Sequence, residues 1–186
     1  MSAHPPSRPV PPAVWSAMLL TAGLGTRLAP LSDLAAKPAL PVAGLPLAGR
    51  ILRWLAAGGV ADAVLNLHHR PASITAAIGD GAAFGVRVRY SWEPRILGSA
   101  GGPARALPML DADRFFLVNG DTLTDLDLAA LAAHFALADQ HGAQVLLHCH
   151  AGAGAARVAH GAGGVEREGG GKHHAAFVLV GGRHQR

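Results

Sequence analysis

Short apolar runs alternate with amphipathic segments through most of the chain. The apolar runs are continuous, as in Phe115-Phe116-Leu117-Val118, which is typical of strands buried on both faces of a parallel sheet. Predicted strands cover residues 14–20, 63–67, 86–91, 115–119 and 144–147, and predicted helices cover 47–57, 71–78, 102–107 and 127–139. This alternation predicts an α/β fold in which a Rossmann-like, mostly parallel but mixed sheet is sandwiched by helices.

Polar residues mark the start of the last predicted helix. Thr124 is a candidate N-cap, because its hydroxyl can accept a hydrogen bond from a backbone N–H of the first turn. Asp125 and Asp127 place negative charge at the same end, where the helix dipole favours it. We therefore expect this helix to begin near residue 127.

Both ends of the chain depart from the alternating pattern. Residues 1–12 include five prolines, which cannot donate backbone hydrogen bonds, and are predicted to be a disordered lead. Ten of the last 36 residues are glycine, and the periodic pattern stops near Cys149. The sequence therefore predicts one domain over residues 13–147 and a poorly ordered tail over 148–186. Truncation or a change of reading frame would explain such a tail, so we expect the fold to be incomplete.

Composition and charge narrow the function classes. A length of 186 residues suits one domain, and a hydrophobic fraction of 50% excludes wholesale disorder. The net charge is +4, but the arginines are scattered and form no basic stripe, so we expect no nucleic-acid partner. A single cysteine excludes a disulfide framework within the chain and a cysteine-based zinc finger. The apolar runs are too short to span a membrane and the N-terminus has no secretory signal, so a cytoplasmic location is expected.

A glycine-rich turn, Gly23-Leu24-Gly25-Thr26-Arg27-Leu28, directly follows the first predicted strand. Ligands of parallel sheets bind beside the carboxyl ends of the strands, where this turn lies. Glycines let backbone N–H groups approach a phosphate, and the Arg27 guanidinium can bind its oxygens. A tight turn with an exposed arginine explains the same residues without a ligand. The dinucleotide site of an NAD-dependent oxidoreductase fits poorly, because Leu28 replaces a small residue and no acidic residue follows about 20 positions later.

Two charged residues stand out by their context. Lys37 is one of two lysines among 16 basic residues, and its compact ammonium suits a phosphate that moves during a reaction. Asp121 follows Gly120 and a buried strand, so its carboxylate is expected to project at the carboxyl end of the sheet. An oxygen ligand there suits Mg²⁺, which proteins hold through one or two carboxylates together with substrate phosphates. A solvated lysine and an aspartate that opens a turn are the alternatives that involve no ligand.

Two separated blocks give a more specific signal. The first reads Gly23-Leu24-Gly25-Thr26-Arg27-Leu28-Ala29-Pro30-Leu31-Ser32, and the second reads Lys37-Pro38-Ala39-Leu40-Pro41-Val42. In order and spacing they resemble the GxGTRLxPLT and KPxxPV motifs of the sugar-1-phosphate nucleotidyltransferases, also called NDP-sugar pyrophosphorylases. Ser32 for the usual threonine and Ala36 for a frequent proline are the departures. The resemblance covers about residues 14–147 and implies the nucleotide-diphospho-sugar transferase type of fold.

The resemblance implies transfer of a nucleoside monophosphate from an NTP to a sugar 1-phosphate, with release of pyrophosphate. Arg27 would hold the leaving pyrophosphate, Lys37 the reacting phosphates, and Asp121 the Mg²⁺ that bridges them. The residues implied in nucleotide binding are Ala22, Gly23, Gly25, Thr26, Glu93, Gly98 and Gly120. Among these, Glu93 and the loop from Gly98 would border the nucleobase, although the same loop could equally cap the helix that follows.

One part of the family's site has no match in this sequence. The resemblance implies a second metal-binding aspartate and a sugar-phosphate lysine in the C-terminal third. No aspartate follows Asp139, and Lys172 lies in a segment rich in glycine and histidine. A truncated, non-catalytic nucleotide-binding remnant of the family is therefore the alternative. The nucleobase, the sugar and the oligomeric state stay open.

Overall fold

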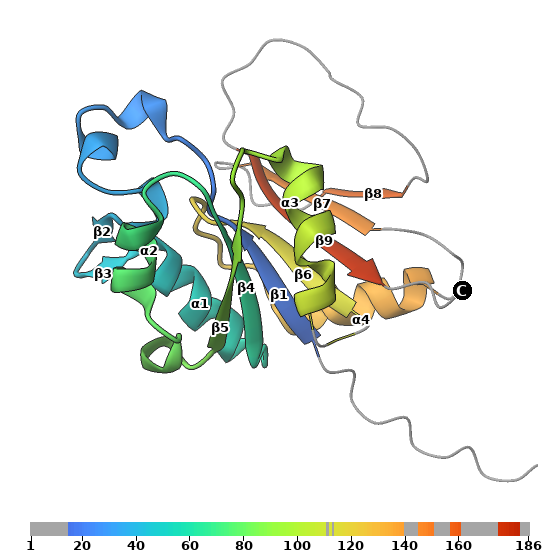
Figure 1. Ribbon diagram of the computed structural model, residues 1–186. Helices are drawn as coiled ribbons and strands as arrows, with labels where there is room; N and C mark the ends of the chain where they lie inside the picture. Colours follow the sequence, from blue (N-terminus) through green and yellow to red (C-terminus); the bar gives the residue numbers. More distant parts are fainter. Residues whose placement is uncertain are drawn as a thin grey trace, which may run out of the picture.

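The computed structural model describes residues 15–110, 112, 114–139, 145–150, 157–160 and 175–182 (Figure 1). The helices are α1 (Leu47–Ala57), α2 (Pro71–Ile78), α3 (Gly98–Ala106) and α4 (Leu128–Asp139). The strands are β1 (Trp15–Leu20), β2 (Pro41–Val42), β3 (Leu45–Pro46), β4 (Asp62–Leu67), β5 (Arg87–Trp92), β6 (Arg114–Asn119), β7 (Val145–His150), β8 (Arg157–His160) and β9 (Ala175–Gly182). Short 3-10 helices are η1 (Thr26–Leu28), η2 (Leu31–Asp33), η3 (Lys37–Ala39), η4 (Ala82–Phe84) and η5 (Leu107–Met109).

One mixed sheet has the strand order β5-β4-β1-β6-β9-β7-β8, and β2 and β3 form a separate antiparallel pair. Strands β5, β4, β1 and β6 are parallel to one another, so their carboxyl ends meet at one edge. Strand β9 lies antiparallel between β6 and β7, and β8 is antiparallel to β7. The predicted α/β architecture with a mostly parallel, mixed sheet is confirmed.

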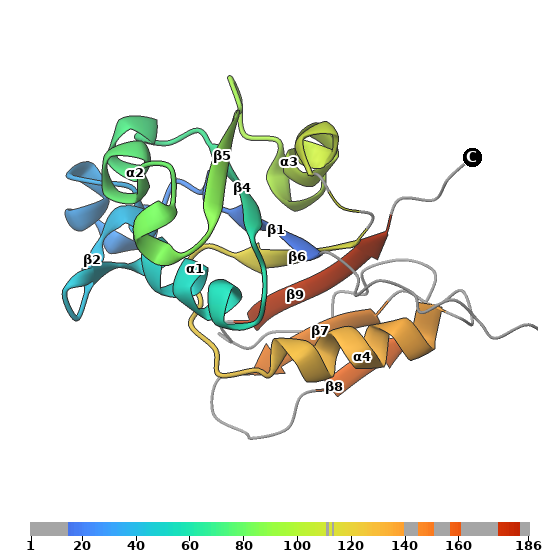
Figure 2. The same cartoon turned by 90° about the horizontal axis from the view of Figure 1, so that it is seen from below.

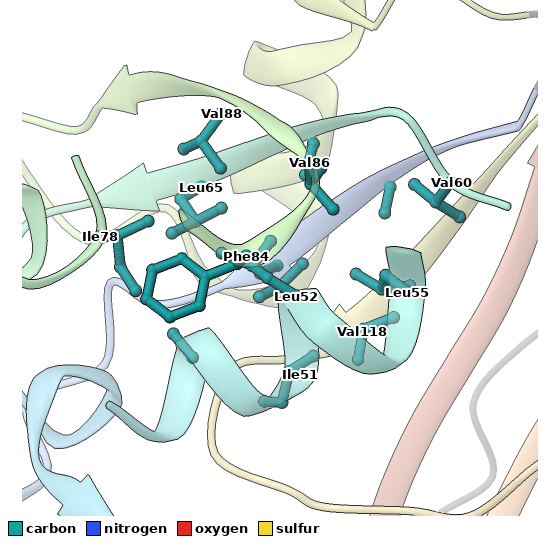
Figure 3. Packing of buried hydrophobic residues seen from close by; sticks show 14 of the residues in the cluster. Ile51, Leu52, Leu55, Val60, Leu65, Ile78, Phe84, Val86, Val88 and Val118 are labelled. Atoms are coloured by element: carbon teal, nitrogen blue, oxygen red, sulfur yellow. The ribbon is translucent and has the colours of Figure 1, made fainter. Parts of the chain in front are cut away.

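Helices cover both faces of the sheet, with α3 on one face and α1 and α4 on the other (Figure 2). Alternate residues of β1 therefore enter different cores. Ala17 and Leu19 join the cluster built on α1, α2 and α4, whereas Met18 joins the cluster beneath α3. All three side chains are fully buried, which explains why the strand reads as a continuous apolar run. Figure 3 shows the larger cluster, in which Phe84 packs among residues from α1, β4 and β5.

The start of α3 differs from the prediction. Helix α3 begins at Gly98, whereas the sequence predicts a helix from residue 102. In the structure Pro103 lies in the helix interior, and the side chain of Glu93 accepts a hydrogen bond from the N–H of Leu97 at 3.0 Å. This contact adds negative charge at the helix N-terminus, where the dipole favours it.

The structure corrects one of the two residues predicted to cap the N-terminus of α4. The Oδ1 atom of Asp127 accepts hydrogen bonds from the backbone N–H groups of Ala129 and Ala130 at 2.8 and 3.1 Å. The expected role of Asp127 is confirmed. The expected cap by Thr124 is wrong, because its hydroxyl instead accepts from Leu126 N–H at 3.3 Å, within the turn that precedes the helix.

The sheet includes strands on both sides of residue 147. Strand β7 runs through that position, and β8 and β9 belong to the segment that the sequence assigns to a tail. Residues 151–156, 161–174 and 183–186, like the predicted lead over 1–12, lie outside the described residues. The domain boundary at 147 therefore stays a prediction. None of the described helices is both long and apolar enough to cross a membrane.

Replacing Asp127 tests the cap of α4. Asp127→Ala removes the acceptor for two backbone N–H groups and should lower the free energy of unfolding by about 1 kcal/mol. Thr124→Ala removes one contact within a turn and should change that free energy by less than about 0.5 kcal/mol. Urea denaturation followed by circular dichroism measures both values. A larger loss in Thr124→Ala than in Asp127→Ala would assign the cap to Thr124.

Candidate active site

Two adjoining cavities lie at the carboxyl ends of β1, β4 and β6. The larger cavity, of about 660 Å³, is bounded by the segment that follows β1 and by Lys37 and Asp121. The smaller cavity, of about 290 Å³, is bounded by the ends of β4 and β6 and by the start of α3. Both cavities share Leu20, Gly23, Ile96 and Asp121. They are therefore two compartments of one site.

The wall of the larger cavity is the irregular segment between β1 and β2, which contains η1, η2 and η3. This segment is anchored to the elements around α2. The N–H of Ala36 donates to the hydroxyl of Ser73 at 3.0 Å, and Nε2 of His69 lies 3.2 Å from the carbonyl oxygen of Ser32. Ser32, Ala36 and Pro38 are buried. The wall is therefore held by its own packing and hydrogen bonds.

The glycine-rich turn at the start of this wall has a specific backbone requirement. Gly25 has a φ of 63°, a left-handed conformation that glycine adopts without strain. An added Cβ at Gly23 would meet no atom within 4 Å, so Gly23 leaves open space at the boundary of both cavities. The turn therefore brings backbone rather than side chains to the cavity.

Charged side chains face the larger cavity. Nζ of Lys37 and Oδ2 of Asp121 are 2.7 Å apart, an ion pair between residues 84 positions apart in the chain. The two side chains are 25% and 41% exposed, so both can reach a ligand in the cavity. Thr122 donates a hydrogen bond to Oδ1 of Asp121 at 3.3 Å. Arg27 is exposed and lines the same cavity. Two cations and one carboxylate thus surround this space, a composition that suits an anion carrying several charges.

A buried polar cluster lies behind the smaller cavity. Asn66 accepts a hydrogen bond from Thr21 N–H at 2.6 Å, and its amide group donates to Oε1 of Glu93 at 2.8 Å. The Thr21 hydroxyl donates to the carbonyl oxygen of Asn66. Thr21, Asn66 and Glu93 are all buried, and Glu93 has no exposed surface. The cluster joins the ends of β1, β4 and β5 through side-chain hydrogen bonds.

The structure brings most of the predicted site residues together. The larger cavity is lined by Gly23, Gly25, Thr26, Arg27, Lys37 and Asp121, and the smaller one by Ala22 and Gly98, with the buried side chain of Glu93 behind them. Gly120 lines neither cavity. A Cβ on Gly120 would lie 2.6 Å from Cγ2 of Thr21 and 2.7 Å from the carbonyl oxygen of Leu20, so this glycine permits β1 and β6 to approach closely.

Sequence reasoning assigned no role to several lining residues. Ser99 and Asn119 add polar groups to the smaller cavity, and Leu24 and Leu28 add apolar surface to the larger one. The position of Asn119 at the end of β6, two residues before Asp121, is a signal that the sequence contains. Leu28 belongs to the first motif block, whereas nothing in the sequence alone distinguishes Leu24 from an ordinary turn residue.

Asp121 is the described carboxylate that is best placed for a cation. It is partly exposed, lies on the boundary of both cavities, and offers the hard oxygen ligand that Mg²⁺ prefers. Within the part of the chain that the structure describes, no group of three histidine, cysteine, aspartate or glutamate side chains could hold a metal ion. The residues present thus fit a cation held by one protein carboxylate and by ligand oxygens.

Curated proteins similar to this chain include sugar-1-phosphate nucleotidyltransferases. An N-acetylmuramate alpha-1-phosphate uridylyltransferase of Neisseria meningitidis is 48% identical over 115 residues, covering 61% of this chain and 50% of the relative. A mannose-1-phosphate guanylyltransferase of Mycobacterium tuberculosis is 42% identical over 115 residues, covering 62% of this chain and 32% of the relative. The chain thus spans half or less of the length of these relatives.

Solved structures share the fold. A putative glucose-1-phosphate thymidylyltransferase from Bacillus anthracis superimposes with a TM-score of 0.64 at 20% identity, over 74% of this chain and 55% of that chain. HddC from Yersinia pseudotuberculosis, crystallised in complex with GMP-PN, gives a TM-score of 0.62 at 20% identity, over 91% of this chain and 77% of that chain. At these identities the likeness establishes the fold alone.

The family follows from the sequence match rather than from the fold. Residues 16–161 match the family model described as nucleotidyl transferase, which includes both motif blocks and the Asp121 region. This match agrees with the expected resemblance and leaves no support for an NAD-dependent oxidoreductase. The chain therefore belongs to the nucleotidyl transferase family.

Proposed function

We propose that this chain transfers a nucleoside monophosphate from an NTP to a sugar 1-phosphate, which yields an NDP-sugar and pyrophosphate. The observation that carries the proposal is the Lys37–Asp121 ion pair, which lines the larger cavity together with Arg27. An NTP and a sugar 1-phosphate both bring phosphate charge, and this cavity offers two cations and one carboxylate. The relatives named above are uridylyl-, guanylyl- and thymidylyltransferases of sugar 1-phosphates, so the proposal covers the class and leaves the base and sugar to experiment.

Transfer at phosphorus requires positioning and charge neutralisation more than covalent chemistry from the protein. A phosphate oxygen of the sugar 1-phosphate attacks the α-phosphorus of the NTP, and the bond from that phosphorus to the pyrophosphate oxygen breaks. Arg27 holds the departing pyrophosphate. Lys37 exchanges its partner, from Asp121 to the phosphate oxygens that gain charge, because its 2.7 Å pair is partly exposed to solvent and easily replaced. The backbone of Gly23 and Gly25 lets the phosphates approach the wall.

Asp121 is the residue that would hold Mg²⁺ in this proposal. Bound Mg²⁺ would neutralise phosphate charge, and it needs one or two carboxylates beside the phosphates themselves. Release of Lys37 from the ion pair frees the Asp121 carboxylate for this role. Breaking the ion pair thus makes Lys37 available to phosphate and Asp121 available to Mg²⁺. The cytoplasmic location and the absence of a nucleic-acid partner, both expected from the sequence, stay predictions.

A direct assay tests the activity. The chain is incubated with Mg²⁺, one of UTP, GTP, dTTP or CTP, and a panel of sugar 1-phosphates that includes those of N-acetylmuramate, mannose and glucose. Pyrophosphate release that requires both substrates would support the proposal. Binding of an NTP without pyrophosphate release would instead support the non-catalytic alternative.

Arg27 and Lys37 can be tested separately from activity. We expect Arg27→Ala and Lys37→Ala each to weaken NTP binding by about 1.5–3 kcal/mol, or roughly ten- to more than a hundredfold, because each removes a charge-assisted phosphate contact. Unfolding free energy should change little, since neither side chain is buried in the core. Arg53→Ala is a matched control, because Arg53 is exposed on α1 and lines neither cavity. Unchanged NTP affinity in both site variants, measured by calorimetry, would contradict the assignment.

If Asp121 holds Mg²⁺, its replacement should remove the effect of Mg²⁺ on NTP binding. Asp121→Asn keeps the size of the side chain and removes the charge that a hard divalent cation needs. The parent should bind the NTP more tightly when Mg²⁺ is added, whereas Asp121→Asn should lose most of this gain. Calorimetric titrations with and without Mg²⁺ measure the difference. An equal gain in the parent and the variant would make Asp121 a partner of Lys37 alone.

A further inference from the structure

The smaller cavity has a wall whose position depends on one buried carboxylate. We propose that Glu93 is a positioning residue that fixes the start of α3 against this cavity and does not itself contact the substrate. This inference rests on the proposed function, which makes the cavity part of a nucleotide site. It replaces the expectation that Glu93 borders the nucleobase, because Glu93 has no exposed surface.

Both carboxylate oxygens of Glu93 already have a donor within the protein. Oε1 accepts from the amide of Asn66 at 2.8 Å, and Oε2 accepts from the N–H of Leu97 at 3.0 Å. The backbone of Glu93 is fixed as well. Its N–H donates to the carbonyl oxygen of Leu67 at 2.8 Å, and its carbonyl oxygen lies 2.8 Å from Nδ1 of His68. Glu93 therefore connects the end of β4 with the residue that precedes α3.

The direction of each hydrogen bond in this cluster is determined. The N–H of Thr21 can only donate, so the Asn66 atom that faces it at 2.6 Å must be the amide oxygen. The amide nitrogen of Asn66 then faces Glu93 and must donate to it. The N–H of Leu97 can also only donate. The position between Asn66 and Leu97 therefore needs a side chain that accepts at both ends, and a carboxylate does so where an amide cannot.

The packing around the cluster leaves no room for adjustment. A Cβ on Gly102 of α3 would lie 2.7 Å from Oε1 of Glu93 and 2.9 Å from Nδ2 of Asn66. Such distances are well below ordinary contact, so α3 lies directly on the Asn66–Glu93 pair. The hydrogen bond to Leu97 fixes the helix start from the other side. The result is a fixed place for Gly98 and Ser99, which line the smaller cavity.

Substitutions that exchange the amide of Asn66 and the carboxylate of Glu93 test this inference. In Glu93→Gln the new amide must direct its nitrogen at either Asn66 or Leu97, and either choice sets two donors against each other. In Asn66→Asp two carboxylate oxygens meet across the 2.8 Å contact. The double variant Asn66→Asp/Glu93→Gln restores every hydrogen bond: Asp at 66 accepts from Thr21 and from the new amide, and the amide oxygen accepts from Leu97. It also keeps one carboxylate in the cluster.

The first readout needs no ligand. Hydrogen exchange followed by mass spectrometry is measured on the peptide that spans residues 94–102. We expect exchange at the start of α3 to be at least about tenfold faster in each single variant and to return towards the parent rate in the double variant. Asp127→Asn is the matched control, because asparagine caps a helix as well as aspartate does. Unchanged exchange in Glu93→Gln, or no recovery in the double variant, would overturn the inference.

The second readout uses two ligands. Binding is measured for the NTP among UTP, GTP, dTTP and CTP that the parent binds best, and for pyrophosphate, both with Mg²⁺. Glu93→Gln should weaken NTP binding by about tenfold or more and leave pyrophosphate binding unchanged, since Arg27, the proposed pyrophosphate ligand, lines only the larger cavity. The double variant should recover NTP binding. Equal losses for both ligands would indicate general destabilisation and overturn the positioning role. A parent that binds no NTP would refute the proposed function, whereas the exchange data would still decide whether Glu93 fixes α3.

Discussion

The parallel pairing of β1 between β4 and β6 is the constraint on which the site depends. It aligns Leu20 with Asn119 on one side and Leu19 with Leu65 on the other, so three strands end together. Because β1 is covered on both faces, its side chains from Ala17 to Leu19 are apolar and fully buried. Polar residues appear at once beyond that edge, where the sheet no longer needs apolar surface. The ligand cavities and the apolar core are thus consequences of one alignment.

The charges of the site are balanced within the protein before any ligand arrives. Lys37 and Asp121 neutralise each other in the larger cavity, and neither must remain as an isolated charge. The carboxylate of Glu93 has a different environment, because it is fully buried and is stabilised by neutral donors and by the start of a helix. One carboxylate can exchange partners and the other cannot. The partly exposed Asp121 is therefore suited to a ligand, whereas the buried Glu93 is suited to holding the cavity wall.

Local patterns in the sequence were sufficient to predict most helices and strands and the charged residues of the larger cavity. Continuous apolar runs predicted β1 and β6, and the two motif blocks placed Arg27 and Lys37 beside the sheet edge. Contacts between distant residues were not predictable. The choice of Asp127 over Thr124 as the cap depends on the path of the preceding turn. Helix α3 starts at Gly98, and the contact of the preceding residue Leu97 with the Glu93 carboxylate is one that no local pattern indicates.

The anchoring of the segment after β1 has a consequence for the thermodynamics of binding. Ala36 is fixed to Ser73, Ser32 is close to His69, and buried residues underlie the turns between them. A wall of this kind is preorganised, so a ligand does not have to order a loose loop when it binds. The conformational entropy of that ordering, about 1–2 kcal/mol per residue, has already been lost during folding. Affinity at this wall is therefore determined mainly by charge and desolvation, and it should weaken steeply as salt concentration rises.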